Sequence, residues 1–138
     1  MKVFIVSPWN ARCGIATYSA YLSDAIQSEG HEVKILAERK DVLPQGVDKD
    51  FPYKHIPSVE CWSRNEDFQS LLKIVEEEKP DVVHIQHQFG LFPDIQNMKN
   101  LYARLKSKTK IITTLHDVVS FSPQFEDYFN ILIQGFGS

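Results

Sequence analysis

The stretch VFIVSPWNARCGIATY, residues 3–18, decides the fold. Four apolar residues, Val3 to Val6, lead into a polar turn that ends at Gly14. Apolar residues then recur up to Ile26 at the spacing of one helix face, so a strand, a turn and a helix are predicted. The first turn of a helix has unpaired N–H groups and a partial positive charge, which together bind anions such as phosphate. Gly14 would either let a ligand approach the backbone or simply ease a tight turn, and this segment leaves both interpretations open.

The rest of the chain alternates between strand and helix patterns. Strands are predicted over residues 2–7, 31–37, 53–56, 81–86 and 110–115. Helices are predicted over residues 15–29, from a capping box at 63–66 to Pro80, from Asp94 onward, and from Pro123 to about residue 134. This alternation predicts an α/β fold, a Rossmann-like parallel sheet with helices on both faces. Because no strand follows the last helix, we expect the chain to be a truncated piece of a larger protein.

Length and composition restrict the class of protein. With 138 residues, of which 43% are hydrophobic and 24% charged, the chain is expected to form one ordinary globular domain. A net charge of -3 does not suggest a nucleic-acid partner, and no apolar run could cross a membrane or act as a secretory signal. Cys13 and Cys61 lack metal-binding spacing and are expected to be reduced thiols of a cytoplasmic protein.

Residues that could carry chemistry gather at one edge of the predicted sheet. Ligands of open parallel sheets bind beyond the carboxyl ends of the strands. The predicted strands bring four groups to that edge: residues 8–14, Glu38, residues 87–90 and residues 116–117. A glycine turn, an aromatic loop, two histidines and an acid therefore converge, and we expect the functional site there.

The histidines of this region have different expected roles. His84 and His87 lie three positions apart on one strand, so they should point to opposite faces and cannot form a metal pair. His87 and His116 could share a metal with Asp117, but no further ligand is evident and we expect no metal site. His116 directly follows an apolar strand and is expected to act in binding or catalysis. Asp117 would orient His116, hold a substrate hydroxyl or cap the loop.

A dinucleotide-binding site is the main competing hypothesis. It requires G-x-G-x-x-G after the first strand, and only Gly14 is present there, although Glu38 is well placed for a ribose. No lysine of the P-loop type follows the first turn either. A nicotinamide-dependent oxidoreductase and a P-loop kinase are therefore disfavoured.

Three segments span nearly the whole chain: PWNARCGIATYS at residues 8–19, DVVHIQHQFG at 81–90 and TTLHD at 113–117. Together, and in this order, they resemble the signatures of family 4 glycosyltransferases, which have the GT-B fold. The resemblance implies that residues 1–138 are the N-terminal, acceptor-side domain of a retaining enzyme of hexosyltransferase type, incomplete at its C-terminus. Such an enzyme moves a sugar from a nucleotide-sugar to a sugar or lipid-linked acceptor. It usually needs no metal or other cofactor, since the nucleotide-sugar is a substrate.

The same resemblance assigns roles to individual residues. His116 matches the histidine that contacts the donor sugar near the reacting carbon, and it is the implied catalytic residue. The donor's phosphates and sugar would lie against four residues: Cys13, Gly14, Ile15 and Asp117. The acceptor side would be shaped by five residues: Trp9, His87, Gln88, Phe89 and Gly90.

Two departures from the family bear on activity. Cys13 stands where the family often has the first of two glycines. The spaced pair of glutamates that marks the family's nucleotide site is absent from the chain. The C-terminal GT-B domain is therefore expected as a missing partner, and the chain alone should fold without catalysing transfer. The alternative function is a stand-alone small-molecule binding or regulatory domain with this fold.

A cluster of basic residues lies in and just after the helix that starts at Asp94: Lys99, Arg104, Lys106, Lys108 and Lys110. Family members that glycosylate lipids often sit on anionic membranes through such surfaces. Peripheral contact with the inner face of the membrane is one interpretation of the cluster. An ordinary solvated helix face is the other, and the more frequent one.

Overall fold

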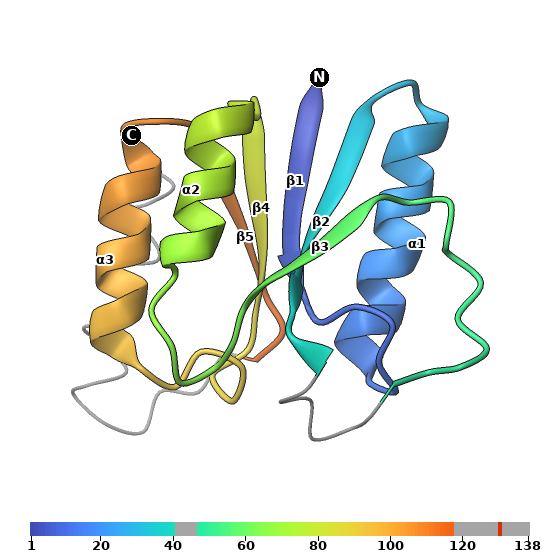
Figure 1. Ribbon diagram of the computed structural model, residues 1–138, viewed down its shortest axis with the longest axis horizontal. Coiled ribbons are helices and arrows are strands. Elements are labelled where there is room, and N and C mark those ends of the chain that lie inside the picture. Colours follow the sequence, from blue (N-terminus) through green and yellow to red (C-terminus); the bar gives the residue numbers. More distant parts are fainter. Residues whose placement is uncertain (41–46, 118–129, 131–138) are drawn as a thin grey trace.

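The computed structural model describes residues 1–40, 47–117 and 130, and these contain one sheet of parallel strands (Figure 1). The strand order is β3-β2-β1-β4-β5, and every paired strand is parallel to its neighbour. The strands are β1 (Lys2–Ser7), β2 (Glu32–Glu38), β3 (Ser58–Trp62), β4 (Val82–His87) and β5 (Lys110–Leu115). The predicted Rossmann-like parallel sheet is thus confirmed.

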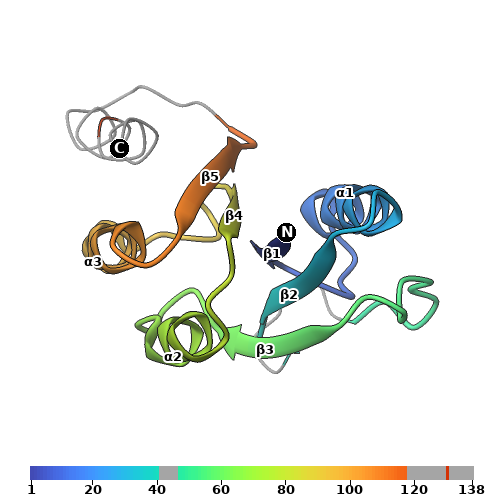
Figure 2. The same cartoon turned by 90° about the horizontal axis from the view of Figure 1, so that it is seen from above.

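Helices cover both faces of this sheet, as predicted. The helices described are α1 (Gly14–Ser28), α2 (Gln69–Glu78) and α3 (Ile95–Lys106). Figure 2 shows α1 on one face, and α2 and α3 together on the other. The predicted helix after Pro123 lies outside the described residues, apart from Asn130. Among the helices described, none is long and apolar enough to cross a membrane.

Strand β1 lies at the centre of the sheet, and both of its faces are buried. Phe4 and Val6 pack into the core beneath α2 and α3, whereas Val3 and Ile5 pack on the side of α1. Successive side chains of a strand point to opposite faces, so a strand covered on both sides must be apolar at every position. This explains the uninterrupted apolar run at the start of the chain.

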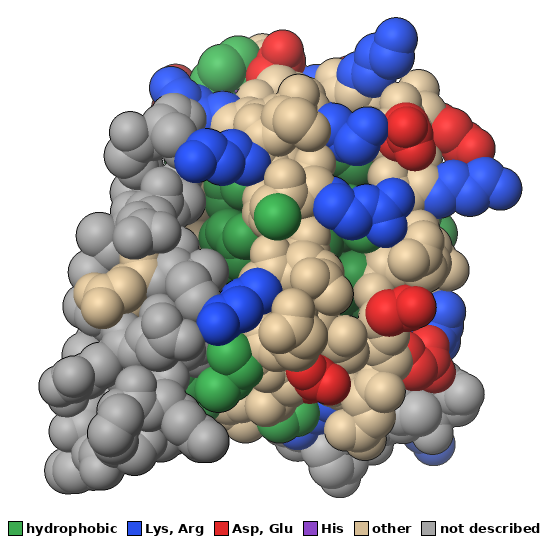
Figure 3. All heavy atoms as spheres, turned by 90° about the vertical axis from the view of Figure 1, so that its left-hand side faces the viewer, with side chains coloured by type: hydrophobic (Ala, Val, Ile, Leu, Met, Phe, Trp, Pro, Cys, Tyr) green, Lys and Arg blue, Asp and Glu red, His purple; other side chains and the backbone are tan. Residues whose placement is uncertain are grey.

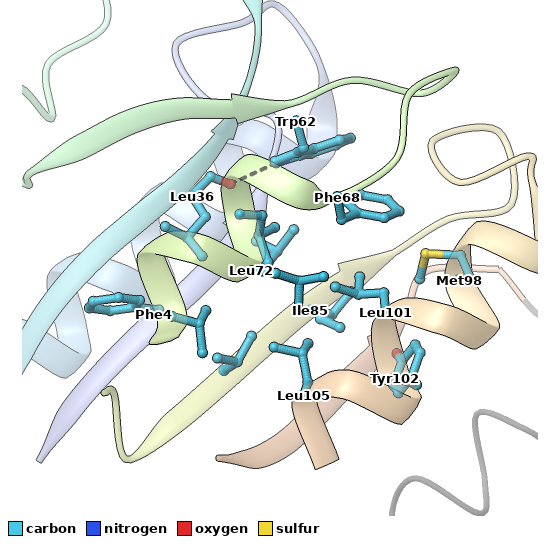
Figure 4. Packing of buried hydrophobic residues seen from close by; sticks show 14 of the residues in the cluster. Phe4, Leu36, Trp62, Phe68, Leu72, Ile85, Met98, Leu101, Tyr102 and Leu105 are labelled. Atoms are coloured by element: carbon cyan, nitrogen blue, oxygen red, sulfur yellow. Dashed lines mark hydrogen bonds between the residues drawn. The ribbon is translucent and has the colours of Figure 1, made fainter. Parts of the chain in front are cut away.

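The larger core lies between the sheet and the α2–α3 layer (Figure 4). Trp62 at the end of β3 is fully buried, and its ring stacks on Phe92 with a centroid separation of 5.0 Å. The indole Nε1–H donates to the backbone oxygen of Leu36 at 2.8 Å. Tyr102 of α3 is likewise buried, and its hydroxyl lies 2.6 Å from Thr113 Oγ1. The polar atoms of both rings are therefore paired, as burial requires.

The third strand was predicted at residues 53–56, and this prediction is wrong. Those residues form a turn in which the Ile56 N–H donates to the Tyr53 oxygen at 3.2 Å, and β3 follows Pro57 instead. Ile56 is buried in the cluster on the side of α1, and Tyr53 packs against Phe51. The apolar side chains of the segment thus cover a helix and do not extend the sheet.

The predicted capping box at residues 63–66 is also wrong. Helix α2 begins at Gln69, and Ser63 and Glu66 only close a backbone turn. The Glu66 carboxylate pairs with Arg39, so it is not available to cap a helix. Phe68 stands at the helix start without a side-chain cap, because its buried ring packs near Trp62 and Phe92. Tertiary contacts of Glu66 and Phe68 therefore prevent the capping box and shift the start of the helix to Gln69.

Other helix ends agree with the prediction. Asp94 caps α3 by accepting a hydrogen bond from the Asn97 N–H at 3.0 Å. Helix α2 ends before Pro80, with Lys79 in the left-handed conformation at φ 50. A residue before proline is disfavoured in the helical region, which explains this ending.

Replacing Leu101 by alanine should destabilise the chain by about 3 kcal/mol, because it opens a cavity in the core under α3. Leu101 is 1% exposed. Urea unfolding followed by circular dichroism measures the loss. Lys106→Ala, at an exposed position of the same helix, is the matched control and should change stability by less than about 0.5 kcal/mol. Equal stability of both variants would contradict the packing described.

Candidate functional site

The strand order reverses direction between β1 and β4, and a pocket opens there at the carboxyl ends of the strands. Strand β1 pairs with β2 on one side and with β4 on the other. The pocket has a volume of about 450 Å³ and is lined by Cys13, Gly14, Ile15, Gln88, Leu91 and His116. Such a switch point is where ligands of open α/β sheets bind. Of the groups predicted to converge at this edge, Cys13, Gly14, Gln88 and His116 line the pocket, whereas Glu38 and Asp117 do not.

The start of α1 forms one wall of the pocket. Cys13 is the extended N-cap residue, and its Sγ accepts a hydrogen bond from the Ala16 N–H at 3.4 Å. A Cβ added to Gly14 would meet no atom within 4 Å, and the φ of this residue is not in the left-handed region. Neither packing nor the turn requires glycine at this position. The absent side chain instead leaves the end of the helix open toward the pocket.

His116 forms the opposite wall and is held from several directions. Its backbone N–H donates to the His87 oxygen at 2.9 Å. The ring Nε2 lies 2.8 Å from Oε1 of Gln86, a fully buried residue on β4. The Tyr18 ring of α1 meets the imidazole nearly at right angles, with centroids 5.0 Å apart. His116 is therefore fixed by the sheet and by α1.

Burial lowers the pKa of His116 below its usual value, and the nearby negative charge of Asp117 opposes this shift. The ring is accordingly neutral at pH 7. A neutral imidazole has one nitrogen that donates a hydrogen bond and one that accepts. Beside a sugar it can hold a hydroxyl without adding a positive charge.

Asp117 itself stabilises the neighbouring loop. Its Oδ1 accepts a hydrogen bond from the Phe89 N–H at 3.3 Å. The Gln88 oxygen in turn accepts from the N–H groups of Leu91 and Phe92, at 3.0 and 3.2 Å. Of the three roles considered for Asp117, the described contacts show loop capping. Asp117 does not line the pocket, so a direct contact with the donor is not supported.

The side chain of His87, at the end of β4, is buried in the core. It is 0% exposed and stacks on Phe92 at 5.4 Å, with Phe89 edge-on at 5.0 Å. Burial, with a smaller contribution from the charge of His116, lowers the pKa of His87 to about 4. This neutral interior residue supports the 88–92 loop and does not line the pocket. Phe89 is half-buried and Gly90 exposed beside the pocket, although neither lines it.

Trp9 is also placed away from the pocket. It is 4% exposed, and its ring packs edge-on against Phe51 at 4.9 Å in the cluster on the side of α1. Its position after β1 was predicted correctly, but its side chain is part of the core. A direct role of Trp9 in acceptor binding is therefore not supported.

Glu38 at the end of β2 and His84 within β4 are engaged in other contacts. Glu38 is fully buried, and its Oε1 accepts a hydrogen bond from Arg64 Nε at 3.1 Å. Burial raises the pKa of Glu38, and Arg64 partly counteracts this. His84 lies 2.7 Å from Thr114 Oγ1, and burial lowers its pKa. Within residues 1–40, 47–117 and 130, no group of three metal-ligating side chains is close enough to hold an ion.

Sequence reasoning missed three residues of the site. Leu91 lines the pocket, Gln86 contacts His116 from β4, and Tyr18 covers the imidazole from α1. Gln86 could have been noticed in the sequence, because a glutamine inside a strand that is predicted to be buried needs a hydrogen-bond partner. Tyr18 looked like one more apolar residue of a helix face. Only the packing of α1 on the sheet brings it to His116.

The topology defines a Rossmann-like α/β domain with a pocket at its switch point. The chain belongs to Glycosyltransferase Family 4, whose family model matches residues 13–136. The family expected from the three sequence segments is thereby confirmed.

Two solved structures show the same fold at low sequence identity. A glycosyltransferase from Streptomyces sp. SF2575 is 15% identical with a TM-score of 0.51, and the match covers 99% of this chain and 43% of that one. A family 3 carbohydrate esterase from Clostridium thermocellum is 12% identical with a TM-score of 0.50, covering 97% and 70%. The chain thus spans less than half the length of the glycosyltransferase structure. No curated protein matches it.

Replacing His87 by phenylalanine should weaken the acid sensitivity of the fold. The pKa of His87 is about 4 in the folded chain and about 6.5 for an unperturbed histidine. The unfolded state therefore binds more protons between these values, and the free energy of unfolding falls as pH falls through this window. The variant should lose about 3 kcal/mol less than the wild type between pH 7 and 4, since one pKa unit corresponds to about 1.4 kcal/mol.

Urea unfolding at the two pH values measures this difference. His55→Phe is the matched control, because His55 lies at the surface, where it contacts Asp24. It makes the same replacement at an exposed histidine and so shows what the substitution does without burial. Glu38 and the other carboxyl groups are common to all three proteins and cancel in the comparison. An identical fall in stability for wild type and His87→Phe would show that His87 is not the buried neutral group described.

Proposed function

We propose that the chain is the acceptor-side domain of a retaining glycosyltransferase that moves a hexose from a nucleotide-sugar to an acceptor. The observation that carries this proposal is the pocket in which the open start of α1 faces a neutral, immobilised His116. Family membership supports glycosyl transfer. The retaining mechanism, the nucleotide-sugar donor and the acceptor belong to the proposal.

The start of α1 would receive the donor phosphates. Its first-turn N–H groups are aligned with the helix dipole, and the side chains of Cys13 and Ile15 flank the open position of Gly14. This part of the pocket can therefore bind negative charge without a basic side chain. The departing nucleotide diphosphate carries such a charge when the bond to the sugar breaks.

His116 would hold the transferred sugar. In a glycosyl transfer, positive charge builds up on the ring as the leaving group departs. A neutral imidazole can accept a hydrogen bond from a sugar hydroxyl without repelling that charge. Because the backbone and ring of His116 are fixed by β4 and α1, the geometry is set before the sugar binds.

The loop formed by residues 88–91 would shape the acceptor side. Gln88 supplies an amide that can bind hydroxyl groups, and Leu91 supplies an apolar wall. The loop is held by Asp117 and by the stacking of His87 on Phe92. The roles inferred for His87 and Asp117 thus act through the loop rather than through direct contact.

The donor-binding site would be completed by a second domain. The family's glutamate pair at the nucleotide site is absent from this sequence, so we propose a C-terminal GT-B domain as the partner and no catalysis by these residues alone. A cytoplasmic location is part of the proposal, and the free thiols of Cys13 and Cys61 accord with it. No metal or other cofactor is proposed.

The basic cluster on α3 is better interpreted as a solvated helix face. Figure 3 shows basic and acidic side chains together on this side of the molecule. Lys108 pairs with Glu76 at 3.2 Å, which neutralises part of the charge. The apolar neighbours Leu101, Tyr102 and Leu105 are buried and cannot insert into a bilayer. We therefore expect no salt-sensitive flotation of the chain with anionic vesicles, whereas flotation at low salt would support membrane contact.

Replacing His116 by alanine in the complete enzyme should lower turnover about a hundredfold or more, as expected for one lost donor or acceptor at the reacting group. The fold should survive, because the side chain lies at the edge of the pocket. Steady-state kinetics of nucleotide release, with circular dichroism as a folding check, measures the effect. His55→Ala is the matched control and should retain wild-type turnover.

Wild-type turnover in a folded His116→Ala enzyme would overturn the role of His116. A donor screen on the same protein tests the broader proposal. If binding of small molecules is found without transfer of any sugar, the stand-alone binding domain becomes the better description.

A further inference from the structure

We infer that Gln86 is the positioning residue of His116: it holds the imidazole as the tautomer protonated at Nε2, so that Nδ1 is the nitrogen that accepts a substrate hydrogen bond. The catalytic part of this inference rests on the proposed function. The hydrogen bond itself, Gln86 Oε1 to His116 Nε2 at 2.8 Å, does not.

Gln86 has no evident structural reason to be polar. It is 0% exposed, and its amide nitrogen has no hydrogen-bond partner among the described residues. Its contact with His116 is the one side-chain hydrogen bond that the described structure gives it. An apolar residue of similar size would avoid burying an unpaired N–H group. The glutamine is therefore explained by His116 and not by the packing of the sheet.

The sheet geometry makes this contact precise. Strands β4 and β5 pair in register, with Gln86 beside Thr114 and His84 beside Ile112. Two hydrogen bonds then cross the same face in the same diagonal direction, from His84 to Thr114 and from Gln86 to His116. His116 lies just beyond the end of β5. Its hydrogen bond to Gln86 therefore fixes the imidazole ring relative to the sheet.

The charge state of His116 makes the choice of tautomer meaningful. Burial lowers the pKa of the ring, so a neutral form prevails at pH 7 and must carry its proton on one nitrogen. Two neighbouring histidines on β4, His84 and His87, also have pKa values lowered by burial and add no positive charge. Among the residues that the structure describes, Asp117 is the negative group that acts on the ring, and its carboxylate is engaged with the 88–92 loop.

The other groups that face the ring do not compete for Nε2. Tyr18 of α1 presents its ring at right angles to the imidazole, and Cys13 lies across the pocket with its sulfur on the Ala16 N–H. Among the described residues, Gln86 is thus the group that can select the tautomer of His116. With Nε2–H directed to Gln86, Nδ1 is the ring nitrogen left to accept.

Nuclear magnetic resonance of the 138-residue chain labelled with 15N-histidine tests the inference without any activity. Long-range proton–nitrogen spectra distinguish the two tautomers, and a pH titration gives the pKa of each histidine. For the wild type we expect His116 in the Nε2–H form. An Nδ1–H form would overturn the inference, and this measurement needs no variant.

Two variants sharpen the test. Gln86→Glu places a carboxylate on Nε2 and should raise the pKa of His116 by about one unit or more. Gln86→Met keeps the size but removes the hydrogen bond, so His116 should become a mixture of tautomers. Thr114→Val is the matched control: it removes the neighbouring bond to His84 and should leave the tautomer of His116 unchanged. An unchanged His116 in Gln86→Met would overturn the inference.

The effect of Gln86 on catalysis is measured in the complete enzyme. Gln86→Met should lower kcat about tenfold with little change in the donor KM, and Gln86→Glu should move the acidic limb of the kcat profile to higher pH. Both effects require that His116 acts on the sugar. If the spectra show the Nε2–H tautomer of His116 but the His116→Ala enzyme retains turnover, the proposed function is wrong and the hydrogen bond between Gln86 and His116 is still supported. If His116→Ala is inactive but Gln86→Met shows the wild-type profile, the positioning role fails alone.

Discussion

The parallel pairing of β1 between β2 and β4 is the constraint on which the rest of the structure depends. Parallel neighbours cannot be joined by a tight turn, so each pair needs a crossover that covers one face. The crossover from β1 to β2 runs through α1, and those that follow β3 and β4 run through α2 and α3 on the other face (Figure 2). At the carboxyl ends these connections diverge, and the pocket occupies the space between them.

Burial of this sheet also sets the chemistry of the site. A polar side chain inside a covered strand needs a partner, and His84 and Gln86 of β4 find theirs on or just after β5. The same burial disfavours charge, so His84, His87 and His116 all have lowered pKa values. A row of neutral, hydrogen-bonded groups results. A site of this kind is suited to orienting hydroxyl groups rather than to binding a charged ligand through basic side chains.

The mistaken predictions share one physical cause, which is competition between local patterns and long-range packing. Tyr53 to Ile56 look like a short strand, but Ile56 is buried against the side of α1. Glu66 fits a capping box, but Arg39, which lies directly after β2, binds its carboxylate. The same long-range packing places the side chains of Trp9 and His87 in the core, although both residues stand at the predicted edge of the sheet. Position along a strand was predictable, whereas the direction and partners of a side chain were not.

The sequence by itself determined the order of elements, the parallel sheet and the edge that carries the site. Apolar runs and helical spacing depend on neighbours in the chain, and Asp94 and Pro80 act through local backbone chemistry. The tertiary structure alone decided which of these edge residues line the pocket and which support it. The contacts of His116 with Gln86 and Tyr18 join three elements distant in sequence, because strand register and helix packing bring them together.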